Sequence, residues 1–160
     1  MHLCKHKISI MIQDSVDLIE RKKKFLSQIV ESEMVWGLKG ENGFATSNSS
    51  ELEDEDGEPI GVVCFWGNPV LAEVCQTEDW ESYLPTSIPL SDFIENWCVG
   101  MSNDGLLVGL NFDDAMIGFE FDPLDLILEI ADEIQIQKKE IALQQFESLN
   151  ALVQEIKKIL

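Results

Sequence analysis

The densest run of chemically capable side chains is ELEDEDGEP, residues 51–59, in which six of nine residues are carboxylates. Carboxylates at this density could bind Ca²⁺, which takes oxygen ligands. An EF-hand loop needs the pattern D-x-[DN]-x-[DN]-G and a glutamate six residues after the glycine. With the glycine of the stretch in that place, Asp54 and Asp56 fit, but the end positions fall on Leu52 and Val63. We therefore expect a solvated loop and no metal site.

Paired carboxylates could also hydrolyse a neutral or cationic small molecule. Such chemistry needs two carboxyl groups that face one cleft, one of them with a raised pKa. The chain has 30 Asp and Glu, so many pairs are compatible with the sequence alone. A carboxylate-dependent hydrolase is therefore an alternative, and no catalytic residue is assigned to it.

Histidine, cysteine and phosphate-binding motifs offer little other chemistry. Both histidines, His2 and His6, lie in the first few residues, so neither a catalytic triad nor a His-ligated metal is expected. The four cysteines are Cys4, Cys64, Cys75 and Cys98. No CxxC pair occurs and the last three lie in apolar segments, which predicts buried free thiols. Without a GxxxxGK[ST] or GxGxxG motif, no cofactor is expected either.

The charge is distributed very unevenly along the chain. The net charge is -19, and all 11 Lys and Arg lie in residues 5–39 or 138–158. Residues 40–137 contain 22 Asp and Glu and no base. This pattern disfavours nucleic acid and anionic membranes and favours a basic protein as the partner. We find no signal peptide and no spanning segment, and the cysteines suit a reducing compartment, so a cytoplasmic protein is expected.

Aromatic residues are the natural anchors of a protein interface, because Trp and Tyr are enriched at hot spots. Trp66 and Trp97 lie in apolar contexts and are expected in the core, whereas Trp80 is flanked by acids in TEDWESY and is the candidate exposed anchor. The candidate partner-binding residues are Glu53, Asp54, Glu55, Asp56, Asp79, Trp80, Glu81 and Tyr83.

Apolar periodicity and turn residues predict the elements that carry these groups. The expected elements are a helix at 13–32, strands at 34–39, 44–47 and 60–67, a polar loop at 48–59, a helix at 68–76, a connecting segment at 77–89, a helix at 90–101, a hairpin of strands at 106–112 and 116–121, and a helix from 122. Asn68 and Asp122 are each followed by proline, an arrangement typical of an N-cap. Ser91 or Asp92 is the expected cap of the helix between them.

A 4-3 alternation of apolar residues breaks at QKKE, residues 137–140, and restarts over 142–160. This helical segment is expected to pack within its own chain, in the first place against the first helix. Pairing with a second chain, as a structural homodimer through residues 141–160, is the alternative. The predicted organisation is one domain over 13–136, a helical extension over 137–160 and a flexible N-terminus over 1–12.

The expected order of elements is α-β-β-β-α-α-β-β-α, which places the chain in the α+β class. We expect a small antiparallel or mixed sheet of about five strands, covered by helices on one face.

Several pieces of the chain follow one another in a specific order: an aromatic strand ending in Trp66, then Cys75, Trp80, Tyr83 and Pro85, then IPLSDFIENW at 88–97 and DG at 104–105. On these pieces, residues 22–130 resemble the bacterial domain-of-unknown-function family 2750. The chain departs from the family in having Gly67 and Asn68 before Pro69. The resemblance implies a small, soluble bacterial α+β domain without an assigned function, so it transfers no catalytic residue.

These observations favour a non-enzymatic cytoplasmic interaction domain whose acidic central region docks on a basic protein, as immunity proteins and inhibitors do. The motivation is the run of 22 acids without a base. Such docking is expected to depend on salt.

Overall fold

The computed structural model describes residues 2–160, and the side chains of residues 16–49 and 52–160. The helices are α1 His2–Ser32, α2 Pro69–Val74, a 3₁₀ turn η1 Glu78–Trp80, α3 Leu90–Asp92, a π-helical segment η2 Phe93–Cys98, α4 Val99–Asn103, α5 Pro123–Ile136 and α6 Leu149–Ile159. The strands are β1 Met34–Gly40, β2 Gly43–Phe44, β3 Thr46–Glu53, β4 Pro59–Trp66, β5 Leu84–Pro89, β6 Leu107–Leu110 and β7 Phe119–Phe121. The α+β class is confirmed.

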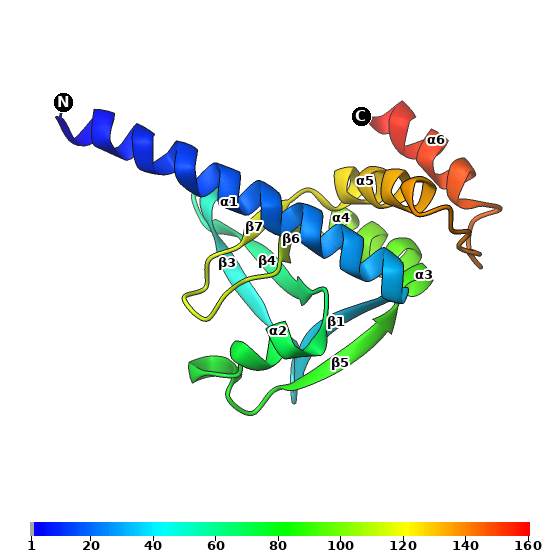
Figure 1. Ribbon diagram of the computed structural model, residues 1–160, viewed down its shortest axis with the longest axis horizontal. Coiled ribbons are helices and arrows are strands. Elements are labelled where there is room, and N and C mark those ends of the chain that lie inside the picture. Colours follow the sequence, from blue (N-terminus) through cyan, green and yellow to red (C-terminus); the bar gives the residue numbers. More distant parts are fainter. Residues whose placement is uncertain (1) are drawn as a thin grey trace.

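The seven strands form one mixed sheet in the order β2-β1-β4-β6-β7, to which β3 adds beside β4 and β5 beside β1. Strand β4 pairs antiparallel with β1 and β3 and parallel with β6. Helix α1 lies across the sheet with α5 alongside it, and α6 packs beyond α5 (Figure 1). The expected flexible N-terminus, residues 1–12, falls on residues whose side chains lie outside this description.

The sheet splits around a single small residue. Strands β1 and β4 pair directly where Trp36 faces Trp66. Further along, the amide of Ala45 donates to the carbonyl of Leu38 at 2.8 Å, and the amide of Cys64 donates to the carbonyl of Ala45 at 3.1 Å. Ala45 is thus inserted between β1 and β4. It connects β2, which pairs with β1, to β3, which pairs with β4.

Side chains of β4 alternate between two separate cores. Val63 and Phe65 face the larger core under α1, η2 and α5, whereas Val62, Cys64 and Trp66 face a smaller one with α2 and η1. Alternation follows from the period of two in a strand. The expectation of a sheet covered on one face was wrong, because short elements shield the second face.

Two of the three predicted N-caps are present in the structure. The side chain of Asn68 accepts from the amide of Leu71, and that of Asp122 accepts from the amide of Leu124, as predicted. The predicted cap at Ser91 or Asp92 was wrong, because the helix begins after Pro89 without a side-chain cap.

Two stretches predicted as irregular are strands. The polar stretch 48–59 was expected to be a loop, but β3 extends to Glu53 and β4 begins at Pro59, leaving residues 54–58 as the turn. Strand β5, which lies within the expected connecting segment 77–89, pairs with β1 from Met34 to Lys39. In both cases hydrogen bonds to a neighbouring strand stabilise a segment of low strand propensity.

The C-terminal segment is helical only in its second half. Residues 139–148 form neither helix nor strand, and α6 begins after Ser148, whose hydroxyl accepts from the amide of Ala151. Leu152 and Ile156 of α6 are buried in the larger core. Helix α6 therefore packs within its own chain, as expected, but against α5 rather than against the first helix.

Candidate functional site

A carboxylate hydrolase needs two acids that face one cleft. One hollow among the described side chains that contains two acids measures about 210 Å³ and is lined by Glu33, Glu140, Leu90 and Ser91, among others. Glu33 is already paired with Lys139 at 3.6 Å. A larger, open hollow lies along the outer side of α1, where Asp17 and Glu20 stand among three basic side chains. Neither is the enclosed pocket that the hydrolase hypothesis requires.

A raised carboxyl pKa does not coincide with either hollow. Partial burial, followed by the charges of Asp122 and Glu129, raises the pKa of Asp125 above its ordinary value. Asp125 lies in the first turn of α5, and it does not line the hollow that contains Glu33 and Glu140. Neither of these two hollows therefore holds an acid with a raised pKa, which acid–base catalysis would require.

The acidic turn 54–58 is closed by hydrogen bonds to one of its own carboxylates. The side-chain oxygen Oδ1 of Asp54 accepts from the amides of Asp56 at 2.9 Å and Glu58 at 3.0 Å. Across the described residues, no cluster of three His, Cys, Asp or Glu is arranged to hold a metal ion. The most acid-rich stretch thus uses one carboxylate to close a hairpin, a common role of Asp in turns.

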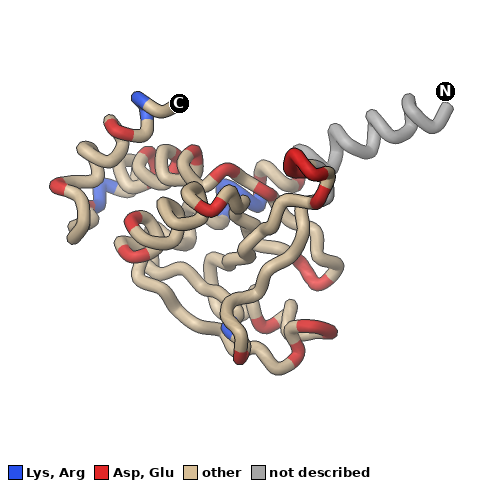
Figure 2. The backbone as a smooth tube through the Cα atoms, turned by 180° about the vertical axis from the view of Figure 1, so that it is seen from behind, with Lys and Arg blue, Asp and Glu red and all other residues tan. Residues whose placement is uncertain are grey.

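The structure divides the candidate partner-binding residues into two groups. Glu53, Asp54, Glu55 and Asp56 lie before β4, and Asp79, Glu81 and Tyr83 follow its other end through α2. A strand of eight residues separates its two ends by roughly 23 Å at about 3.3 Å per residue. Acids are indeed spread over several sides of the molecule rather than gathered on one face (Figure 2).

The proposed aromatic anchor is not exposed. Trp80 is only 6% exposed and packs edge-to-face on Trp66, with ring centroids 6.1 Å apart. Tyr83 is half-buried against Gly40. The expectation that Trp80 is a surface anchor was wrong, because the turn η1 directs it into the smaller core while its acidic neighbours Asp79 and Glu81 stay outside.

Phe112 joins the segments at the end of β4. Its carbonyl accepts from the indole of Trp66 at 2.8 Å and from the thiol of Cys75 at 3.1 Å. A Cβ at Gly118 would lie 2.1 Å from the Phe112 ring, so glycine is needed where the ring packs. This arrangement holds the loop 111–118 beside α2. Sequence reasoning missed it, although the glycines around the phenylalanine in GLNFDDAMIGF were the available signal.

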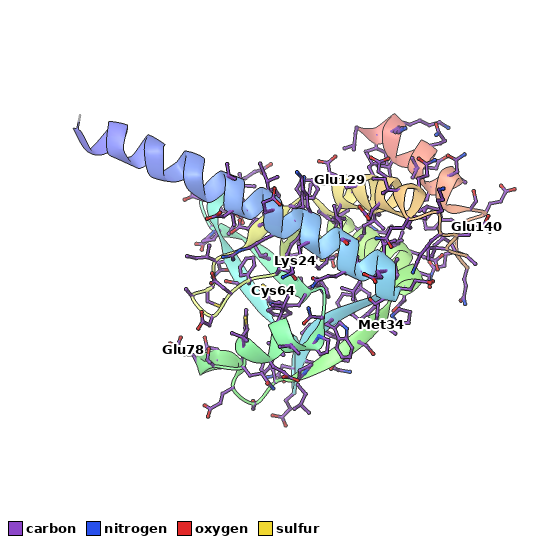
Figure 3. The ribbon with its side chains drawn as sticks, viewed as in Figure 1. Lys24, Met34, Cys64, Glu78, Glu129 and Glu140 are labelled. Carbon is purple, nitrogen blue, oxygen red and sulfur yellow. The ribbon has the colours of Figure 1, made fainter. Side chains whose placement is uncertain are left out.

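This junction brings carboxylates from two distant segments together. We call the group the α2–loop acidic surface, and its members are Glu73, Glu78, Asp79, Glu81, Asp113 and Asp114. Glu78 lies at the edge of the molecule next to α2 (Figure 3). Burial first, and then the charges of Asp113 and Asp114, raise the pKa of the Cys75 thiol to about 11 against the opposing indole of Trp66. The loop acids are therefore close to the end of α2.

One cation and two apolar side chains complete the surface. Arg21 of α1 pairs with Asp113 at 3.0 Å. The same carboxylate accepts from the amides of Ala115 and Ile117. On α2, Val70 and Val74 are 63% and 51% exposed on successive turns. The α2–loop acidic surface thus combines acids with a small apolar strip, and the charge of Asp113 is compensated by Arg21.

Cations from the two ends of the chain contact segments that are distant in the sequence. Lys22 pairs with Glu129 at 2.9 Å and lies over the rings of Phe119 and Phe121. Lys139 donates to the carbonyls of Val30 and Glu31 at the end of α1. The segregation of Lys and Arg in the sequence therefore becomes a set of contacts between segments distant along the chain.

The three described cysteines confirm the expectation of buried free thiols. Burial raises the pKa of Cys64 and Cys98 far above the ordinary thiol range. Such thiols are poor nucleophiles, because the thiolate is the reactive form. None of the helices over the described residues is long and apolar enough to cross a membrane.

Comparison with known proteins identifies the family. Searches of the curated proteins and of the solved structures gave no significant match. The family model described as "Protein of unknown function (DUF2750)" matches residues 22–130, which span the sheet, α2 and the first half of α5. The chain therefore belongs to the DUF2750 family.

Proposed function

We propose that the protein is a non-enzymatic, cytoplasmic interaction domain of a bacterial cell that docks on a basic protein, in the manner of an immunity protein or an inhibitor. The docking surface is the α2–loop acidic surface. One observation carries this proposal: the contact of Cys75 with the carbonyl of Phe112 holds two segments some 40 residues apart together. One segment carries Glu73, Glu78, Asp79 and Glu81, the other carries Asp113 and Asp114, and Arg21 pairs with Asp113.

Electrostatics and the exposed valines support this surface over the turn 54–58. Clustered negative charge steers a basic partner and makes its association depend on salt. Val70 and Val74 add exposed apolar area on α2, and buried apolar contacts supply much of the affinity of an interface. The turn 54–58 carries acids but projects from one hairpin. Asp79 and Glu81 therefore remain candidate partner-binding residues. Trp80 contributes indirectly, because its packing on Trp66 holds the turn that carries them.

The two alternatives receive less support. A hydrolase would need converging acids in a cleft, and the hollow at Glu33 and Glu140 has one of its two acids paired with Lys139. A homodimer through residues 141–160 would need the apolar side of α6, but Leu152 and Ile156 of that side pack into the chain's own core.

The test compares two variants with equal loss of charge. The surface variant carries Glu73→Gln, Glu78→Gln, Asp79→Asn and Asp114→Asn. The control variant carries Glu53→Gln, Glu55→Gln, Asp56→Asn and Glu58→Gln, and keeps Asp54, which closes the turn. The full chain is used to isolate partners at low salt, and the partner that elutes at high salt is purified.

Calorimetric titration of the purified partner then measures its dissociation constant. We expect the surface variant to bind about tenfold or more weakly and the control variant to bind within about threefold of the unaltered protein, because nearby charges dominate a screened interaction. Equal weakening in both variants, or binding that is insensitive to salt, would show that the surface is wrongly placed.

A further inference from the structure

The C-terminal strap, defined as residues 137–160, is held to the family domain by side-chain contacts. Lys139 donates to the carbonyls of Val30 at 2.9 Å and Glu31 at 2.6 Å, where the last carbonyls of α1 have no partner within the helix. The side chain of Gln137 donates to the carbonyl of Ser27 at 3.1 Å. None of the strap joins the sheet. Lifting it would therefore leave every strand pairing intact.

Glu95 holds the middle of the strap. It lies in the π-helical segment η2 and is 5% exposed. Its Oε1 atom accepts from two successive strap amides, of Gln144 at 2.8 Å and of Gln145 at 2.6 Å. Among the described residues, no Lys or Arg pairs with it. The strap itself therefore supplies the donors that compensate this buried carboxylate, so closure of the strap and burial of Glu95 occur together.

The irregular part of the strap begins at a turn and ends at a helix. Lys138 has a φ of 57°, a left-handed conformation that marks the turn between α5 and the strap. Residues 139–148 have no helix or strand of their own. Helix α6 then begins at Leu149 and is seated on α5 by Leu152 and Ile156. The matched family region ends at residue 130, before the strap begins.

We propose that the strap opens and closes as a unit over η2 and α5, and that Glu95 is its latch. The closed strap occupies an apolar face of the family domain within the same chain. Opening hydrates Glu95 and uncovers the apolar side chains of α5 on which Leu152 and Ile156 rest. This device is separate from the α2–loop acidic surface, and Glu78 and Glu140 lie on opposite sides of the molecule (Figure 3).

Hydrogen exchange of the full chain tests this directly. In the unaltered protein, amides of 149–159 should exchange at least about tenfold faster than those of 126–134 in α5, because the strap opens without the domain. Glu95→Gln should speed exchange in 141–159 by a further factor of about ten and leave β4 unchanged, because a neutral amide oxygen is a weaker acceptor than a carboxylate. The matched control is Glu155→Gln, an exposed residue of α6 paired with Lys158.

Gln144→Pro provides an independent variant, since it removes one amide donor to Glu95 without touching the domain. It should accelerate exchange in the same residues as Glu95→Gln. The proposal is overturned if 149–159 and α5 exchange at the same rate in the unaltered protein. It is also overturned if Glu95→Gln behaves like Glu155→Gln. Either result leaves the partner-docking proposal intact, because that rests on another surface.

Discussion

The indole nitrogen of Trp66 donates a hydrogen bond of 2.8 Å to the backbone carbonyl of Phe112, and both residues are buried. This bond crosses 46 residues of sequence and joins the end of β4 to the loop 111–118. The loop carries Asp113 and Asp114, so the α2–loop acidic surface depends on a contact inside the smaller core. Stability and the placement of the acidic groups are therefore linked at this point.

Replacing Trp66 by Phe tests that link. The change removes the hydrogen bond and leaves space beside Trp80, so the free energy of unfolding should fall by about 2–4 kcal/mol. Trp36→Phe, on the facing strand but only partly buried, should cost less than about 1.5 kcal/mol. Urea denaturation followed by circular dichroism measures both values. Equal costs would contradict a special role for the bond.

Asp113→Ala should destabilise the loop, whereas Asp114→Ala should not. Partial burial works against ionisation of Asp113, but the Ile117 amide and Arg21 outweigh it and hold the pKa of this carboxyl below 3.8. Losing these bonds should cost about 1–2 kcal/mol at neutral pH, against about 0.5 kcal/mol or less for Asp114→Ala.

The pH dependence of this effect has a definite sign. Because the folded pKa of Asp113 is lowered, its contribution is present above about pH 4 and is lost as pH falls through the folded pKa. The difference in urea midpoint between Asp113→Ala and the unaltered protein should therefore shrink toward pH 3 or below. A difference that stayed constant over this range would exclude ionisation as its cause.

Adjacent lysines of α1 should differ sharply in importance. Lys22 is 18% exposed, pairs with Glu129 at 2.9 Å and lies over two phenylalanine rings. Lys23 is 66% exposed and reaches Glu20 only at 3.7 Å. Lys22→Ala should lower the free energy of unfolding by about 1–3 kcal/mol, and Lys23→Ala by about 0–0.5 kcal/mol. Thermal unfolding of the two variants gives the comparison; similar melting temperatures would count against the Lys22 contacts.

Features encoded by a few neighbouring residues were predictable. The caps at Asn68 and Asp122 depend on two or three adjacent residues, and the buried strand β4 shows in a continuous apolar run. Both were predicted correctly because local chemistry decides them. The hairpin of β6 and β7 was also found, although its connection extends from residue 111 to 118.

Features that depend on distant partners were missed. The polar sequence of β3 looks like a loop, and only the pairing of Thr46 with Val63 and its neighbours makes it a strand. Trp80 looks exposed beside its acidic neighbours, and only the position of Trp66 shows that it is buried. The α2–loop acidic surface likewise depends on the contact of Cys75 with Phe112, and the glycines near Phe112 do not reveal that Cys75 is its partner.

The burial of three cysteines predicts that their thiols react slowly in the folded protein. Cys64, Cys75 and Cys98 should resist alkylation in the folded protein near pH 8 and react in denaturant, because burial holds each pKa well above its ordinary value. Peptide mapping by mass spectrometry locates the modified sites. Rapid labelling of Cys75 in the folded protein would contradict its burial.

Alkaline pH should also destabilise the fold through Cys75. Its pKa is about 11 in the folded protein against an ordinary value of 9.0, so the unfolded chain loses this proton first. The stabilising contribution is therefore complete below about pH 9 and is lost as pH rises toward 11. Cys75→Ala should flatten this decline relative to the unaltered protein. An unchanged slope of stability against pH would assign the decline to other groups.

Two glycines should respond in opposite directions to the same substitution. A Cβ at Gly118 would lie 2.1 Å from the Phe112 ring, so Gly118→Ala must displace the ring that orders the loop and should cost about 1–3 kcal/mol. Gly100 lies within the helix α4, and a Cβ there meets no atom within 4 Å. Gly100→Ala should instead stabilise the protein by about 0.5–1 kcal/mol, because alanine loses less backbone entropy on forming a helix. Urea midpoints of the two variants measure both effects. A loss of stability at both positions would contradict the open space at residue 100. A gain at both would contradict the packing of Phe112 against Gly118.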